Sequence, residues 1–393
     1  MSTATCTAPV NIAVVKYWGK RSTELNLPTN SSLSVTLSQD HMCSRTTASC
    51  SPSYTDGDRL WLNGQEETTV SSRLQAVFQA CRALRRKLEE ESGSEVEPLS
   101  TYGIRIVSSN NFPTAAGLAS SASGYAAMVA ALAQMYQLPT DPSSLSVIAR
   151  QGSGSACRSL FGGYVAWDLG SREDGQDSRA RQVAPAAHWP EMEAVICVVS
   201  AKRKSMPSTR GMQETVATSR LMKERIALVP GCMEKMEEAI RQRDFPTFAE
   251  LTMRESNQFH AVCLDTFPPI RYLTDTSYSL IQLVHSFNSN GPRAAYTFDA
   301  GPNAVIYTLK EHVPELIRLI GSQFPAANDT PLFEDSNAIL TPGEDISSAA
   351  DPSVPRGLLT KLIHTRVGEG PVTVEVGPTP GPASLIDASG LPK

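Results

Sequence analysis

The sequence predicts an α+β protein of two domains, each long enough to bury its own hydrophobic core. The chain has 393 residues, which exceeds the usual size of a single core. Strand-like segments occur in both halves of the chain, at residues 8–15 and 294–307. Helical patterns cover most of residues 209–287 between them. We place the boundary near residue 190, which gives domains of residues 1–190 and 191–393.

Composition excludes several classes of protein. Charged residues make up 19% of the chain and the formal net charge is −5, so no broad basic face for nucleic acid is expected. The eight cysteines are scattered, as expected of reduced thiols rather than of disulfides or a zinc site. The sequence contains no apolar run of 18 residues and no secretory signal pattern at its start. We therefore expect a cytoplasmic protein with no membrane partner.

The first predicted strand, residues 8–15, ends in an unusual group of side chains. Lys16, Tyr17, Trp18, Gly19 and Lys20 follow it directly. A buried strand has little reason to end in lysines and aromatic rings unless its end lines a cleft. An ordinary amphipathic strand end with solvated lysines is the alternative. A polar turn at 27–32 and strands at 33–37, 43–49 and 58–64 are predicted next.

A helix is predicted between about residues 68 and 91, where apolar residues recur on one face. Arg73 lies near its start, where a cation opposes the helix dipole, and this position suggests a function for the arginine. The basic run at 82–87, followed by glutamates at 89–91, is interpreted as a solvated face and a fraying end.

Residues 111–124 form a turn of small residues between a strand at 102–107 and a helix that reaches Tyr136. Such a turn lets a phosphate approach the free N–H groups at the helix N-terminus. Ser120 and Ser121 add hydroxyls suited to a phosphate oxygen or to its Mg²⁺. A close-packed helix start with serine caps is the alternative. The chain contains no Walker-type Gly-x-x-x-x-Gly-Lys-Ser/Thr sequence.

A second anion cradle is predicted at residues 151–158, after a helix opened by Asp141-Pro142. Two glycines alternate with two serines ahead of Arg158, which supplies hydroxyls, close backbone approach and a forked donor. A flexible linker is the alternative. Strands are expected at 162–167 and 194–199, and helices at 209–228, 230–243, 246–260 and 270–287.

Asp299 lies at a bend between two strand-like runs, just before Gly301-Pro302. An aspartate at such a position commonly caps the turn. Its alternative role is that of a reacting carboxylate. Residues 325–356 are predicted as loop, 371–376 as a last strand, and the final residues as unstructured.

These features together form an anion site with one candidate reacting carboxylate, the set that phosphoryl transfer requires. The motif at 113–122, Pro-x-x-x-Gly-Leu-x-Ser-Ser-Ala, resembles the phosphate-binding motif of the GHMP kinase superfamily. Ala115 and Ala119 stand where its members usually carry glycine. Within this superfamily the chain resembles the diphosphomevalonate decarboxylases, on residues 8–20, 27–38, 111–123, 153–158, 188–190 and 296–303.

The resemblance implies a two-domain GHMP kinase-like fold with the active site in the cleft between the domains. The N-terminal domain would be the ATP-binding domain, of the ribosomal S5 domain 2-like type. The implied reaction is ATP-dependent decarboxylation of mevalonate 5-diphosphate to isopentenyl diphosphate, with release of CO₂, ADP and phosphate, in the mevalonate pathway of isoprenoid and sterol biosynthesis. ATP and Mg²⁺ are the implied cofactors, and we expect a homodimer.

The resemblance also assigns roles to residues. Asp299 would orient or deprotonate the C3 hydroxyl, Lys16 would steady the developing charge, Arg158 would bind the substrate carboxylate, and Ser121 completes the catalytic set. The substrate would contact Tyr17, Trp18, Gly19, Lys20, Arg73, Ser153, Gly154, Ser155, Ala156, Cys157, Arg158, Ser208 and Thr209. ATP would contact Pro113, Ala116, Gly117, Leu118, Ala119, Ser120 and Ser121, with Mg²⁺ at Ser120 and Ser121.

Two other functions are compatible with part of this pattern. A sibling kinase would leave a stable phosphorylated product and release no CO₂. A non-catalytic ligand sensor would keep the anion site without the reacting groups, and the presence of Lys16, Arg158 and Asp299 argues against it.

Overall fold

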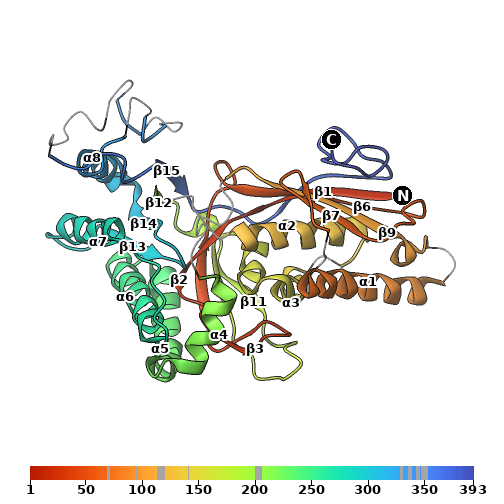
Figure 1. Ribbon diagram of the computed structural model, residues 1–393, viewed down its shortest axis with the longest axis horizontal. Helices are drawn as coiled ribbons and strands as arrows, with labels where there is room; N and C mark the ends of the chain where they lie inside the picture. The colour runs from red at the N-terminus through yellow and green to blue at the C-terminus, as the bar shows by residue number, and fades with distance from the viewer. Residues whose placement is uncertain are drawn as a thin grey trace.

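The computed structural model has two lobes, each built from helices packed on antiparallel or mixed sheets (Figure 1). The predicted α+β class is therefore confirmed. The structure describes residues 1–68, 71–93, 96–112, 120–139, 141–199, 206–327, 331–334, 339–341, 346 and 353–393. Among these residues no helix is both long and apolar enough to cross a membrane.

The first lobe is built on a six-stranded sheet. Its strand order is β16-β1-β6-β9-β7-β8. Helix α2 (Ser120–Met135) packs on β1 and β6. Helices α1 (Ser72–Ser92) and α3 (Pro142–Gly152) lie on the side of α2 that faces away from the sheet (Figure 1). The strands are β1 (Ser2–Pro9), β6 (Cys43–Ser51), β7 (Arg59–Leu62), β8 (Gln65–Glu66), β9 (Gly103–Asn110) and β16 (Val372–Gly377).

A second sheet lies where the lobes meet, with the order β11-β10-β5-β2. Its edge strand β2 ends at Val15, so the following Lys16 leaves the sheet ladder. The members are β2 (Asn11–Val15), β5 (Ser32–Thr36), β10 (Tyr164–Trp167) and β11 (Ala180–Ala184), and a small pair, β3 (Lys20–Ser22) and β4 (Leu27–Pro28), adjoins it. Short 3-10 helices in the described part of the chain cover Leu99–Thr101, Gly154–Leu160, Ala186–His188 and Lys310–His312.

The second lobe holds an antiparallel sheet of order β13-β14-β12-β15. Its helix α6 packs against both β13 of this sheet and β2 of the neighbouring one, so it joins the two lobes. The strands are β12 (Met192–Val198), β13 (Ala294–Phe298), β14 (Ala304–Leu309) and β15 (Lys361–Arg366). The helices are α4 (Ser208–Thr218), α5 (Leu221–Gln242), α6 (Phe245–Asp265), α7 (Asp275–Phe287) and α8 (Val313–Gln323).

The end of the chain returns to the first lobe. Strand β16 pairs antiparallel with β1, from Thr7 opposite Val372 to Thr3 opposite Gly377. The final residues were predicted to be unstructured, and this is wrong: Ile386 is fully buried against the sheet. A single apolar residue in a polar stretch gives no periodic pattern, so the sequence could not predict that Ile386 is buried.

The helix boundaries predicted between residues 209 and 243 were also wrong. Residues 221–242 form one helix through Pro230, where two helices were expected. The chain instead breaks at Ser219, because the Asp265 carboxylate accepts hydrogen bonds from the Ser219 hydroxyl and the Leu221 N–H and so caps α5. Helix α8 was not predicted at all.

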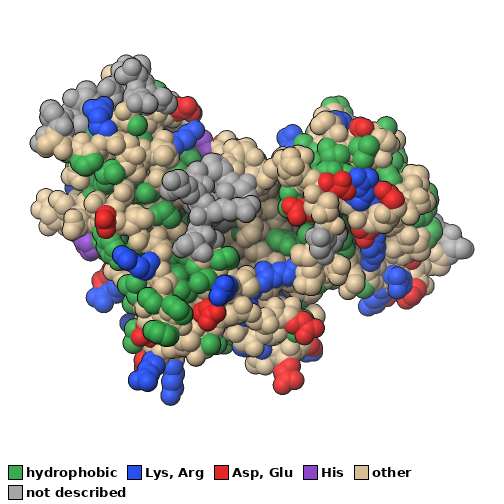
Figure 2. All heavy atoms as spheres, viewed as in Figure 1, with side chains coloured by type: hydrophobic (Ala, Val, Ile, Leu, Met, Phe, Trp, Pro, Cys, Tyr) green, Lys and Arg blue, Asp and Glu red, His purple; other side chains and the backbone are tan. Residues whose placement is uncertain are grey.

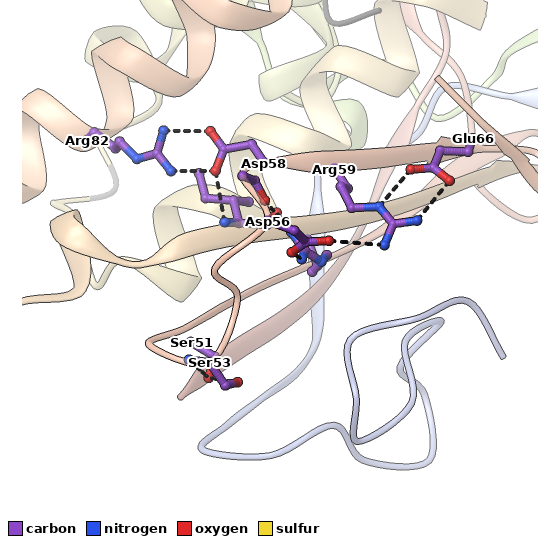
Figure 3. A network of polar contacts seen from close by, with 10 residues as sticks. Ser51, Ser53, Asp56, Asp58, Arg59, Glu66 and Arg82 are labelled. Carbon is purple, nitrogen blue, oxygen red and sulfur yellow. Dashed lines mark hydrogen bonds and ion pairs between the residues drawn. The ribbon is translucent and has the colours of Figure 1, made fainter. Parts of the chain in front are cut away.

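The basic run on α1 is not simply a solvated face. Arg85 is buried and donates to the Tyr136 and Glu97 carbonyls. Arg82 forks onto the Asp58 carboxylate with distances of 2.7 and 2.6 Å, as Figure 3 shows. These arginines tie the helix to the sheet and to neighbouring loops, which sequence spacing alone could not reveal.

Candidate active site

A cavity of about 600 Å³ is lined by residues of both lobes. Figure 2 shows the surface hollowed between the lobes, with Lys and Arg side chains at the margin of the hollow. The described lining includes four cationic side chains but a single carboxylate, Asp299. Such a cavity suits a ligand that carries several negative charges.

The structure brings most of the predicted site residues into this one cavity. Those that line it are Lys16, Tyr17, Trp18, Lys20, Arg73, Ser120, Ser121, Ser153, Gly154, Ser155, Arg158, Ser208, Thr209 and Asp299. Gly19, Ala156 and Cys157 lie beside it without lining it. Pro113, Ala116, Gly117, Leu118 and Ala119 lie outside the described residues.

Lys16 and Asp299 form an ion pair at the floor of the cavity. The Lys16 Nζ donates to Asp299 Oδ1 at 2.6 Å, across a sequence separation of 283 residues. The lysine side chain is 3% exposed, whereas that of Asp299 is 29% exposed. Asp299 directly follows the end of β13, and its side chain lines the cavity. The Gly301 N–H donates to the Asp299 carbonyl and holds the turn before β14. The carboxylate is thus accessible to a substrate hydroxyl, and the ammonium lies behind it.

Burial lowers the pKa of Lys16, because an ammonium loses its hydration inside the protein. Asp299 and Glu255 oppose this effect and raise the pKa, and Arg158 adds to the lowering. A charged lysine at this depth therefore depends on its two carboxylate neighbours.

Arg158 reaches the cavity from the 3-10 helix at Gly154–Leu160. Its Nη1 donates to Ser32 Oγ at 2.5 Å, and its Nε donates to Ser34 Oγ and Asn11 Oδ1 at 3.0 and 3.2 Å. The guanidinium also lies over the Trp167 ring, 5.8 Å from its centroid. Because hydroxyls and an amide hold it rather than a carboxylate, its charge is not neutralised by a permanent partner.

Gly154 allows its backbone to lie close to two aromatic rings. A Cβ at this position would lie 2.8 Å from the Tyr17 ring and 2.9 Å from the Trp167 ring. These two rings pack edge to face with centroids 4.6 Å apart. Among the described atoms the buried Tyr17 hydroxyl has no hydrogen-bond partner, and the Tyr17 side chain lines the cavity.

A second cationic group lies toward the mouth of the cavity. Burial, and then Arg73, lower the pKa of Lys20 to about 8, while its Nζ donates to Asn26 Oδ1 at 2.5 Å. Arg73 donates to the Thr209 hydroxyl at 3.2 Å, which connects α1 to α4. The position of Arg73 near the start of α1, where a cation opposes the helix dipole, is explained because its side chain lines the cavity.

The serines of the two predicted cradles meet at one side of the cavity. Ser121 in the first turn of α2 and Ser153 at the end of α3 have hydroxyl oxygens 3.2 Å apart. No group of three or more His, Cys, Asp or Glu suited to a metal occurs in the described part of the chain. A Mg²⁺ ion here would therefore take oxygen ligands from hydroxyls, phosphates and water, the set this ion prefers.

Sequence reasoning missed several residues that hold the site together. Asn11 fixes both Arg158 and the carbonyl of Ser155, the latter at 3.0 Å. Glu255 and Arg225, buried on α6 and α5, bind the main chain of Lys16. Nothing in the sequence marked these two, because each occupies an ordinary position of a long helical pattern.

Comparison with known proteins gives consistent matches along the chain. Residues 8–180 match the family described as diphosphomevalonate decarboxylase-like N-terminal domain. Residues 194–374 match the mevalonate 5-diphosphate decarboxylase C-terminal domain family. The diphosphomevalonate decarboxylase of Gibberella zeae is 56% identical over 375 residues, which cover 95% of this chain and 97% of the relative. That of Bos taurus is 51% identical, and the match covers 99% and 97% of the two chains.

Solved structures agree with these matches. A crystal structure of mevalonate 5-diphosphate decarboxylase has a TM-score of 0.85 and 47% identity, with 99% of both chains covered. The enzyme of Trypanosoma brucei follows at 0.84 and 39%, covering 96% of this chain and 98% of its own. Another structure, of a complex with MVAPP, AMPPCP and magnesium, has a TM-score of 0.74 and 28% identity, covering 95% and 99%.

Proposed function

The chain belongs to the diphosphomevalonate decarboxylase family and is an ATP-dependent decarboxylase of mevalonate 5-diphosphate; we propose that Asp299, Lys16 and Arg158 carry out its reaction. The predicted family, its two-domain GHMP kinase-like fold and its activity are thereby confirmed. The products are isopentenyl diphosphate, CO₂, ADP and phosphate. The observation that supports the residue roles is the Lys16–Asp299 pair in a cavity whose other described charged side chains are all cations.

Asp299 accepts the proton of the tertiary C3 hydroxyl as that oxygen becomes a nucleophile. ATP with its Mg²⁺ supplies the phosphoryl group that this oxygen receives. Phosphate then leaves C3 with the C–O electron pair, while the electron pair of the bond to the carboxyl carbon forms the new C=C bond and CO₂ departs. Lys16 stays beside Asp299 and stabilises the negative charge near the reacting oxygen.

The remaining groups bind and orient. Arg158, held by two serines and Asn11, offers a fixed guanidinium to the substrate carboxylate. The diphosphate fits the region of Tyr17, Lys20 and Arg73, together with hydroxyls of Ser153, Ser155, Ser208 and Thr209. Ser120 and Ser121 face the cavity at the N-terminus of α2, where the helix dipole favours phosphate, and we assign ATP and Mg²⁺ to this side.

Release of CO₂ tests the reaction directly. The purified protein would be given Mg-ATP and mevalonate 5-diphosphate labelled at the carboxyl carbon. We expect labelled CO₂ and ADP in equal amounts. A sibling kinase would form ADP and a stable phosphorylated product without CO₂, and a ligand sensor would form neither.

Replacing Ser121 with alanine is expected to weaken catalysis by about 2–4 kcal/mol of transition-state stabilisation, as for other preorganised donors. Its hydroxyl faces the cavity beside Ser153, on the side assigned to ATP. Steady-state kinetics with varied Mg-ATP measure the effect. Ser146→Ala on α3 is the control, because the Ser146 hydroxyl donates to the Ser143 carbonyl and accepts the Ala180 N–H, and Ser146 does not line the cavity. An unchanged rate for Ser121→Ala would remove this residue from the site.

Arg73→Ala should raise KM for mevalonate 5-diphosphate more than it lowers kcat, because it binds a group remote from the reacting carbon. Arg82→Ala on the same helix is the control, since Arg82 pairs with Asp58 and neither residue lines the cavity. Initial rates measured at varied concentrations of mevalonate 5-diphosphate give KM and kcat for both variants. A KM equal to that of the parent enzyme would show that Arg73 does not bind the diphosphate.

We further propose that the enzyme is a cytoplasmic homodimer. Both parts of this proposal follow from the family to which the chain belongs. Light scattering after size-exclusion chromatography would measure its mass in solution.

A further inference from the structure

One turn of helix α6 holds the main chain on both sides of the Lys16–Asp299 pair. Glu255 Oε2 accepts the Lys16 N–H at 3.0 Å. The next residue, Ser256, accepts the Phe298 N–H with its hydroxyl oxygen at 3.1 Å. Phe298 directly precedes Asp299. Two adjacent α6 residues therefore fix the backbone that carries the ammonium and the backbone that carries the carboxylate.

Arg225 on α5 completes a closed ring of hydrogen bonds around the Lys16 backbone. Its Nη2 donates to the Lys16 carbonyl at 2.8 Å and to Glu255 Oε2 at 2.9 Å. Asn30 donates to the same carbonyl at 3.0 Å. The N–H and the C=O of Lys16 are thus both satisfied by side chains, in place of the sheet ladder that β2 leaves at Val15.

The ion pair in this ring is buried. The Arg225 side chain is 0% exposed and that of Glu255 is 5% exposed. A buried pair of this kind is weak evidence for stability, because desolvation offsets much of its attraction. Its position suggests another role, since it lies against the residue whose ammonium the reaction uses.

We propose that Glu255, together with Arg225, is a positioning residue for the decarboxylation, which fixes the Lys16 backbone and supplies a second negative charge behind the Lys16 ammonium. Neither residue lines the cavity, so they act through Lys16 and not on the substrate. The inference rests on the proposed role of the Lys16–Asp299 pair.

The charged and titratable groups that act on the Lys16 ammonium are Asp299 after β13, Glu255 and His260 on α6, and Arg158 on the 3-10 helix. Arg225 on α5 contacts the Lys16 carbonyl instead. Burial lowers the pKa of His260 to about 3, so it is neutral in the range of an activity assay. Glu255 raises the pKa of Lys16, so removing its charge lowers that pKa. Activity that needs the ammonium then falls at a lower pH.

The test compares kcat against pH for the parent enzyme and Glu255→Gln, which keeps the size of the side chain. We expect kcat to fall about 10- to 100-fold through misplacement of the lysine. The alkaline limb should move down by about one pH unit, as for loss of a nearby opposite charge. KM for mevalonate 5-diphosphate should stay near the parent value, because no diphosphate contact changes.

Glu193→Gln is the matched control. Glu193 is also a buried carboxylate, 9% exposed and 2.7 Å from His364, but it lies on β12, away from the cavity. The Glu193→Gln variant should have a lower melting temperature, but the alkaline limb of its kcat–pH profile should stay where it is in the parent enzyme.

The double variant Arg225→Met/Glu255→Gln guards against loss of folding, since it leaves no uncompensated buried charge. We expect it to melt above the single variant and still show reduced kcat. A parental kcat and pH profile in both Glu255 variants would overturn the inference while leaving the decarboxylase activity itself in place. If the parent enzyme itself released no CO₂, that result would contradict the proposed function instead.

Discussion

Asp299→Asn is expected to lower the rate of CO₂ release by about 10²–10⁴-fold, the usual contribution of a general base. The amide has nearly the same shape as the carboxylate and can still accept the Lys16 ammonium hydrogen bond. It cannot take the proton of the C3 hydroxyl, and it no longer balances the buried lysine charge. The fold and ATP binding should survive, but the melting temperature should fall, because the buried Lys16 ammonium keeps only one carboxylate neighbour, Glu255.

If Asp299 only capped the turn before β14, asparagine would replace it with almost no effect. Asp265→Asn provides the comparison, because Asp265 does cap a helix through Ser219 and Leu221 and lies outside the cavity. The measurements are CO₂ release, melting temperature and ATP titration on both variants. An Asp299→Asn enzyme that melts normally, binds ATP and decarboxylates at the parental rate would contradict the catalytic assignment.

The parts of the fold that sequence predicted are those set by short-range chemistry. The turn between β13 and β14 follows from Gly301-Pro302, and α3 begins where Asp141-Pro142 predicted, with the Asp141 carboxylate accepting the Ser143 and Ser144 N–H groups. Each signal needs only a few neighbouring residues.

The parts that sequence missed depend on distant partners. Pro230 lies on the exposed side of α5, where a missing N–H costs less than the helix gains by packing on α6. Glu255 and Arg225 lie on helices that show ordinary amphipathic patterns. Their role appears only when Lys16, more than 200 positions earlier in the chain, is placed between them. Periodicity reports which face of a helix is buried, but not what it is buried against.

In the candidate site, too, the sequence identified single residues but not the contacts between distant ones. Single residues such as Arg73 and Lys20 could be selected because charges stood at unfavourable or unexpected positions. Their convergence on one cavity could not be derived from spacing, because the two lobes bring together residues from 16 to 299. The family resemblance supplied that long-range information.

Arg158→Lys is expected to lower kcat/KM about 10²–10³-fold, comparable to the loss of a preorganised charged donor. Lysine keeps the charge but loses the planar fork that Ser32, Ser34 and Asn11 hold in place, so it cannot bind a carboxylate through two parallel hydrogen bonds. Arg150→Lys is the control, because Arg150 is also fully buried in the first lobe but donates to the Gly175 and Ser178 carbonyls outside the cavity. Both variants should lose melting temperature, since each leaves polar groups unpaired. Only Arg158→Lys should lose decarboxylation out of proportion to its loss of stability. Equal activity in the two variants, at matched folded fraction, would show that Arg158 supports the fold and does not bind the substrate carboxylate.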